Sequence, residues 1–295
     1  MLAIIPNKKV FLIVSGVLVA GSILVLAGWG LKLGIDFTGG SLWEMEFKSL
    51  RPHNEEILTA LAGYKIEPAV FQPTGERGLI MKFRAVNENT HEAMKRDLND
   101  LSALEERRFD SIGPTLGREL QKKSLQAVGY VLVLIVSYIA WAFRKVSQPV
   151  SSWKYGLIAV TALVHDVTIP TGAFAILGHF YGVEVDSFFV TAMLTVMGFS
   201  VHDTIVVFDR IRENLKRRPG DDFSLTINAS VNETLARSIN TSLTVLLVLL
   251  AIYFLGGVSV KYFALALILG VFFGTYSSIF VAGPLLSYWA GRGRR

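Results

Sequence analysis

Asp203 stands at the end of an apolar run that begins at Phe188 and is long enough to form most of a membrane-spanning helix. A carboxylate at that depth costs roughly 2.5–3.5 kcal/mol on insertion scales, so it is rarely present without a role. Helical spacing places Ser200 and Thr204 on the same face as Asp203. One ionisable group with hydroxyls beside it predicts a proton or ion site, and its partner is expected elsewhere in the chain.

The composition is that of a membrane protein. Hydrophobic residues make up 52% of the 295 residues, charged residues make up 18%, and the mean hydropathy is +0.46. A helix needs about 20 apolar residues to cross a bilayer. On that basis six membrane-spanning segments are predicted: Val10–Gly28, Leu125–Phe143, Tyr155–Leu177, Phe188–Phe208, Ile239–Leu255 and Tyr262–Leu286. The fifth is the shortest and is expected to begin near Leu235, which would draw Arg237 into the membrane.

The distribution of lysine and arginine predicts the orientation of these segments. Basic residues gather at both termini and in the second–third and fourth–fifth loops: Lys8, Lys9, Arg144, Lys145, Lys154, Arg210, Arg212, Lys216, Arg217, Arg218, Arg292, Arg294 and Arg295. The short loop Gly178–Asp186 has none, so we expect both termini in the cytoplasm. The formal net charge of +5 is divided among these flanks, which argues against nucleic-acid binding.

Residues 32–123 form a polar stretch between the first and second segments, and by topology this stretch lies outside the cytoplasm. Trp43, Met45 and Phe47 alternate with glutamates, as in a half-buried strand. Spacing and turn residues then predict a helix capped by Asn54, strands at 69–72 and 79–84 around a turn at 73–75, a helix around 94–101 and a strand at 108–112. This β-α-β-β-α-β order predicts an α+β, ferredoxin-like domain. The predicted divisions are therefore 1–31, 32–123 and 124–295.

The sequence argues against several other chemistries. Cysteine is absent, which excludes disulfide and thiol chemistry. The pair Gly39-Gly40 is not a phosphate-binding loop, because no Lys-Ser/Thr follows it; it is expected to permit a tight bend before the first strand. The first segment is long for a signal peptide and has no Ala-x-Ala site after it, so we expect an uncleaved helix. Neither a cofactor nor a metal ion is expected.

Four ordered motifs resemble the SecD/SecF family of protein-export membrane proteins. The motif Gly34-Ile35-Asp36-Phe37-Thr38-Gly39-Gly40 follows the first segment, and the motif from Ser111 to Leu120 precedes the second. The stretches from Val201 to Asn214 and from Arg237 to Ser242 resemble the SecF branch rather than the SecD branch. The resemblance covers nearly the whole chain, and four motifs in order are far more specific than a lone Gly-Gly pair.

The resemblance implies a non-enzymatic accessory subunit of the bacterial Sec preprotein translocase, related to the resistance-nodulation-division superfamily. Together with SecD, it would use the proton-motive force to promote late, ATP-independent steps of protein export across the cytoplasmic (inner) membrane. The implied partners are SecD, the SecYEG translocon with YajC and YidC, the translocating preprotein and membrane lipid. The domain at 32–123 would then be periplasmic. Because the chain lacks the SecD half, an activity that needs both halves requires a partner.

In this family, the transmembrane acid and arginine that match Asp203 and Arg237 take part in proton movement. Helical spacing places Asn240, Thr241 and Thr244 on the face of Arg237. Asp203 and Arg237 each lie a turn or two from the cytoplasmic edge of their helices, so they can meet at a similar depth. A neighbouring arginine would hold the acid ionised and its withdrawal would favour the protonated form, which would make the pair a proton switch.

Other interpretations stay open. Asp203 and Arg237 could form a structural ion pair only, and Asp166, near the middle of the third segment, is either a second relay group or a helix–helix hydrogen bond. An intramembrane aspartyl protease is disfavoured, because no Gly-x-Gly-Asp precedes either aspartate and Arg237 would oppose a shared proton. A proton-coupled small-molecule efflux subunit would need a larger extracytoplasmic part. A purely structural assembly factor would tolerate neutralisation of Asp203.

Small residues on the last segment predict close helix packing. Gly270, Gly274 and Ser278 recur every four residues and therefore share one face. Such a face lets two helix backbones approach each other without any chemistry. The neighbour is either another helix of this chain or a helix of SecD.

Overall fold

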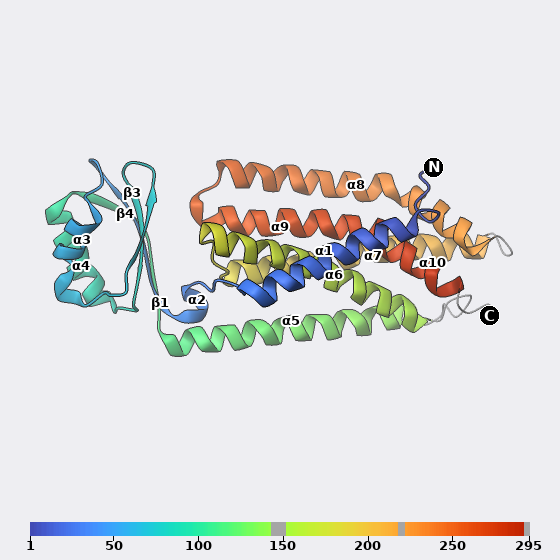
Figure 1. Cartoon of the computed structure of the whole chain (residues 1–295), viewed down its shortest axis with the longest axis horizontal. Coiled ribbons are helices and arrows are strands. Elements are labelled where there is room, and N and C mark those ends of the chain that lie inside the picture. The colour runs from blue at the N-terminus through green and yellow to red at the C-terminus, as the bar shows by residue number, and fades with distance from the viewer. Residues whose placement is uncertain (143–151, 218–221, 292–295) are drawn as a thin grey trace. The chain divides into compact units, whose positions relative to one another are not determined.

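The computed structural model describes residues 1–142, 152–217 and 222–291. Some residues used above to predict spans and orientation lie outside these ranges: Phe143, Arg144, Lys145, Arg218, Arg292, Arg294 and Arg295. The chain divides into two compact units, one made of Met1–Lys32 with Gln126–Arg295 and the other of Leu33–Leu125. Figure 1 shows the elements of both units.

Six helical stretches of the described chain are long and apolar enough to cross a membrane. They are α1 (Lys8–Trp29), α5 (Pro114–Ala142), α6 (Ser152–Tyr181), α7 (Ser187–Arg217), α8 (Phe223–Leu255) and a run of α9 (Val258–Ser277), the π-helical turn η2 (Ser278–Ala282) and α10 (Gly283–Gly291). Apart from position 143, every residue of the six predicted segments lies inside one of these helices. The prediction of six spanning helices is confirmed.

Helix α8 extends beyond the predicted fifth segment. It begins at Phe223, well before Leu235, where the membrane span was expected to begin. The side chain of Asp222 caps it by accepting hydrogen bonds from the backbone N–H groups of Ser224 and Leu225, at 2.8 and 3.1 Å. The first turns are too polar to register as a membrane span, but their inward face is buried, so packing and not hydropathy decides where the helix begins.

In the membrane-type unit, α9 packs against α6, α7 and α8, and α1 packs against α6 (Figure 1). Glycine makes the closest approaches possible. A Cβ atom at Gly270 would lie 2.1 Å from Val196 of α7, and one at Gly274 would lie 3.2 Å from Ser200 of the same helix. The small face predicted on the last segment therefore packs within this chain, against α7.

Two asparagines of α8 hold the start of the chain. The side chain of Asn232 accepts a hydrogen bond from the backbone N–H of Leu2 at 2.7 Å, and that of Asn228 accepts from Ile4 and Ile5 at 3.0 Å each. These bonds satisfy backbone groups that no helix pairs. The contact is long-range, and the sequence analysis did not detect it.

The second unit contains a four-stranded antiparallel sheet with strand order β2-β3-β1-β4. Its elements are α2 (Ile35–Thr38), β1 (Gly40–Phe47), α3 (Asn54–Ala60), η1 (Ala62–Tyr64), β2 (Val70–Thr74), β3 (Gly78–Phe83), α4 (Glu88–Leu101) and β4 (Leu104–Ile112). The predicted order of strands and long helices is therefore present. The alternation in β1 is also confirmed: Trp43, Met45 and Phe47 are fully buried and pack with residues of α3 and α4.

Two local predictions in this unit were wrong. The residue that caps α3 is His53 and not Asn54, because the Glu56 side chain accepts the His53 backbone N–H at 2.8 Å. Pro73 and Thr74 belong to β2 and not to the turn, which follows at 75–77. Proline is tolerated there because β2 is an edge strand, where one side of the backbone needs no partner.

The expected bend at the glycine pair is confirmed. Gly39 and Gly40 have φ angles of 77° and 136°, which L-residues with side chains rarely adopt. A Cβ at Gly39 would lie 2.8 Å from Pro114, and a Cβ at Gly117 would lie 2.9 Å from the Gly39 nitrogen. The two glycine motifs, one after α1 and one at the start of α5, therefore pack directly against each other. Gly34 caps the short helix α2, Asp36 lies in its first turn, and Phe37 is buried.

Candidate functional site

The polar face predicted on α7 is present and buried. Asp203 is 4% exposed, and Ser200 and Thr204 are each 1% exposed. The helix places them together because they lie three to four residues apart. Their shared face points into the helix packing, where water does not screen a charge.

Asp203 is incompletely satisfied by its own chain. Its Oδ2 atom and the hydroxyls of Thr204 and Ser238 are buried and form no hydrogen bond with the described residues. The hydroxyl of Ser238, on α8, lies beside the Asp203 carboxylate but forms no hydrogen bond with it. Leaving a buried carboxylate oxygen without a donor is costly. The Asp203 carboxylate is therefore a buried group with room for a further hydrogen-bond partner.

Asp166 of α6 is, by contrast, fully provided with partners. Its side chain is fully buried, and its Oδ2 accepts hydrogen bonds from Ser200 of α7 and from Ser277 of α9, the latter at 2.7 Å. Its Oδ1 lies 2.8 Å from Nδ1 of His165. The helix–helix hydrogen bond allowed by the sequence is thus formed, and it joins three helices. Because Ser200 precedes Asp203 by one turn, Asp166 also anchors the helix segment that carries Asp203.

The expected charge pair is not formed in this conformation. Among the described residues, no ion pair joins Asp203 to Arg237, and Arg237 is exposed. The reason is the helix phase: Ser238 occupies the side of α8 that faces Asp203, and Arg237 lies about 100° around the helix from it. Asn240, Thr241 and Thr244 are exposed like Arg237, so the polar face predicted on α8 exists but is turned away from Asp203.

Arg237 lines a groove of about 520 Å³ between α7 and α8. The groove is lined by charged and apolar residues: Ala142, Ile205, Val206, Asp209, Arg210, Arg212, Glu213, Glu233, Thr234 and Arg237. Asp209, on the other side of the helix from Asp203, is exposed there and forms an ion pair with Arg212 at 3.4 Å. The groove therefore brings Arg237 near several ionisable groups, although Asp203 is not among its lining residues.

A network of side chains beside this groove was missed by the sequence analysis. The guanidinium of Arg210 lies 2.5 Å from Glu233 and 2.6 Å from Glu213. Asn214 donates to Glu233 and to Ser230, each at 2.9 Å. Only the i, i+3 spacing of Arg210 and Glu213 could have been found beforehand. The contacts from α7 to α8 depend on how the two helices pack, and residue spacing within one helix does not predict that packing.

Two family models match the chain. The model described as "Protein export membrane protein SecD/SecF, C-terminal" matches residues 91–292, and the SecD/SecF GG motif matches residues 25–49. The chain belongs to the SecD/SecF family. The match includes the glycine motif around Gly39 and all of the helices that carry Asp166, Asp203 and Arg237.

Relatives support the same assignment over the full length. The protein translocase subunit SecF of Thermobaculum terrenum is 44% identical, with 99% of this chain and 95% of that protein covered. The subunit of the same name from Anaerolinea thermophila is 39% identical, with 98% and 94% covered.

The crystal structure of SecDF from Thermus thermophilus, a translocon-associated membrane protein, is similar with a TM-score of 0.83 and 31% identity. It covers 99% of this chain, and this chain spans only 39% of that polypeptide. Family membership and the six apolar helices together identify a multi-pass membrane protein.

Proposed function

We propose that this protein is the SecF subunit of a Sec preprotein translocase, which works with SecD to couple the proton-motive force to late steps of protein export. The observation that carries the proposal is the buried, incompletely satisfied carboxylate of Asp203 on α7. Membership of a protein-export family indicates that the transported substrate is a protein. An ionisable group at membrane depth can bind and release a proton.

The exposed polar residues of α8 indicate that a partner subunit covers this face of the helix. Arg237, Asn240, Thr241 and Thr244 are exposed on a helix that otherwise presents leucine, isoleucine and valine. Contact of these polar groups with lipid would be costly. We infer that SecD covers this face. The matched SecDF polypeptide has further segments outside the part that this chain matches, and SecD would correspond to such segments. SecYEG, YajC, YidC and the preprotein are further proposed partners.

In the proposed coupling, Asp203 binds and releases the proton and Arg237 controls its charge state. Because Arg237 is turned away here, the two residues would have to meet through a rotation or tilt of α8 relative to α7, or through an arrangement imposed by the partner. Each charge that crosses the membrane is worth about 2.3 kcal/mol per 100 mV, so several protons could drive such a change. Asp166 would hold α7 in place, and a relay role for it remains the alternative.

We further infer the placement and the type of the second unit. The order β1-α3-β2-β3-α4-β4 and the sheet order β2-β3-β1-β4 support a ferredoxin-like fold. The lysine and arginine distribution supports a periplasmic position for residues 32–123 and cytoplasmic termini in the bacterial inner membrane.

The test is preprotein translocation into inverted membrane vesicles, with and without a proton gradient. Asp203→Asn keeps the shape of the side chain but cannot cycle a proton, so it should insert, assemble with SecD and lose the response to the gradient. Asp100→Asn makes the same chemical change at an exposed position of α4 and should respond like the wild type. An assembled Asp203→Asn protein with a full response would favour a structural assembly factor. Gradient-driven export of a small dye would favour an efflux subunit.

A further inference from the structure

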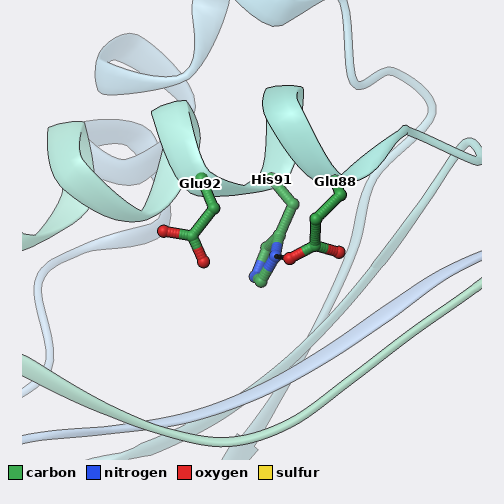
Figure 2. A group of neighbouring side chains, drawn as sticks. All are labelled: Glu88, His91 and Glu92. Atoms are coloured by element: carbon green, nitrogen blue, oxygen red, sulfur yellow. Dashed lines mark hydrogen bonds and ion pairs between the residues drawn. The ribbon is translucent and has the colours of Figure 1, made fainter.

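Helix α4 of the Leu33–Leu125 unit presents a histidine and two glutamates on one side. Glu88, His91 and Glu92 occupy positions i, i+3 and i+4, so their side chains project from the same face of the helix, as Figure 2 shows. One potential ligand atom from each lies within 4.8 Å of the others. Exposed glutamates often lie close together without binding an ion. The case for a metal site therefore depends on the surroundings of His91.

His91 is held rigidly. Its side chain is 2% exposed, its ring stacks on Phe109 of β4 at 3.6 Å with an angle of 2° between the planes, and it meets Trp43 of β1 edge-on at 5.1 Å. The ring therefore cannot turn freely. Its Nε2 atom points towards the sheet and its Nδ1 atom points towards Glu88.

The inner nitrogen has a strong acceptor. Glu106 of β4 lies 2.7 Å from His91 Nε2 and also accepts hydrogen bonds from Trp43 Nε1 at 2.8 Å and Lys95 Nζ at 3.3 Å. A carboxylate that accepts from an indole N–H and an ammonium group acts as an acceptor, so we assign the ring N–H of His91 to Nε2.

The outer nitrogen, Nδ1, is then the ring atom that can bind an ion. It lies 3.4 Å from Oε1 of Glu88. A cation, either a proton on Nδ1 or a metal ion between the two atoms, stabilises this contact. Glu92 lies on the same face of the helix, with a ligand atom within 4.8 Å of those of His91 and Glu88.

We propose that Nδ1 of His91 and the carboxylates of Glu88 and Glu92 bind one divalent transition-metal ion, with Zn²⁺ as the best match. Imidazole nitrogen with carboxylate oxygen is a ligand set that Zn²⁺ accepts. Glu106 would accept the N–H on the other side of the His91 ring. Metal-binding histidines usually donate this second N–H to a carboxylate, which fixes the ring and raises its basicity.

Charge and access agree with this assignment. Glu88, Glu92 and Glu106 together with Lys95 leave two negative charges, which a divalent ion would neutralise. The side chains of Glu88 and Glu92 are 73% and 53% exposed, so an ion can reach them from solvent and they can adjust to it. Lys95 is the competing group, because its Nζ lies 3.9 Å from Glu92 Oε1.

The experiment is calorimetric titration of Zn²⁺ into the full-length chain in detergent, without an affinity tag, together with the visible spectrum after Co²⁺ addition. We expect one equivalent bound. The double substitution Glu88→Gln and Glu92→Gln should abolish saturable binding, and because both positions are exposed it should not disturb folding. A matched control, Glu55→Gln with Asp100→Asn, removes two charges from exposed positions elsewhere in the same unit and should bind normally.

Two further variants separate a metal site from a simple acidic patch. Glu106→Gln should weaken Zn²⁺ binding by about 10–100-fold without removing a ligand, and Lys95→Met should strengthen it. No saturable binding at one equivalent, or equal binding by the Glu88/Glu92 double variant, would overturn the proposal. A third contrary result is a nitrogen NMR spectrum of His91 that shows both ring nitrogens protonated at neutral pH and unchanged by Zn²⁺, since a proton would then be the cation.

Discussion

Ser277 of α9 donates a hydrogen bond of 2.7 Å to Asp166 of α6, whose carboxylate is completely buried. The same carboxylate oxygen accepts a hydrogen bond from Ser200 of α7. One acid on α6 thus fixes two neighbouring helices, and it does so a single turn from Asp203. Removal of the acid would leave two hydroxyls and a histidine nitrogen buried without their partner.

This arrangement predicts that Asp166 has a structural role. Asp166→Asn retains an acceptor oxygen and should keep gradient-dependent export. Asp166→Leu should lower the free energy of unfolding further, by about 1–3 kcal/mol for each polar group left unsatisfied. Thermal unfolding in detergent together with vesicle export measures both. If Asp166→Asn unfolds like the wild type but no longer responds to the proton gradient, Asp166 is a relay group.

Arg237 should be needed for coupling and not for stability, because it is exposed in this chain. Arg237→Met should express, insert and co-purify with SecD, yet lose the response of export to the gradient. The exchange Asp203→Arg with Arg237→Asp should not restore the response, since an arginine cannot release a proton in the working range. Restoration by the exchange would show that the pair is only an ion pair.

The orientation can be tested with single cysteines, because the chain has none of its own. Glu76 lies exposed in the turn between β2 and β3. Glu76→Cys should react with a membrane-impermeant thiol reagent in intact cells whose outer envelope is permeable. Lys9→Cys, exposed at the start of α1, should react only after lysis. The reverse pattern would invert the predicted topology.

The contact of Gly270 with Val196 predicts a specific packing defect. Gly270→Ala places a Cβ atom 2.1 Å from a methyl carbon of Val196, so α7 and α9 must move apart. We expect a loss of about 1–3 kcal/mol in stability. Val196→Ala should relieve part of it, so that the double variant is more stable than the sum of the two single effects. Additive effects would mean that the helices do not meet at this pair.

The lowered pKa of Glu106 predicts that the second unit becomes less stable at acidic pH. The pKa of this carboxyl is lower in the folded protein than in the unfolded chain, so its contribution is fully present above the unfolded value of about 4.3. That contribution is lost as the pH falls through the lower, folded value. The indole N–H resonance of Trp43, which donates to Glu106, should report the change in full-length protein. Glu106→Gln should remove this pH dependence, and an unaltered profile would contradict the assignment.

Much of the fold could be predicted because its signals are local. Apolar length located all six spanning helices, and the alternation of Trp43, Met45 and Phe47 with glutamates identified β1. The burial of Ser200, Asp203 and Thr204 on one face followed from helical spacing alone. Hydropathy located the apolar part of α8 and not its polar first turns, because hydropathy does not detect a buried polar face.

The sequence by itself determined the family, the membrane helices, the strand order along the chain and the presence of an acid at membrane depth. The tertiary structure alone decided which partners the acids have. Asp166 meets Ser200 and Ser277, and Arg237 faces away from Asp203. The physical reason is that a helix fixes the angles between its own side chains, whereas the rotation of one helix against another depends on packing along its whole length. Arg237 and Ser238 are neighbours in the sequence, but their side chains leave α8 in directions about 100° apart. Only Ser238 therefore faces Asp203.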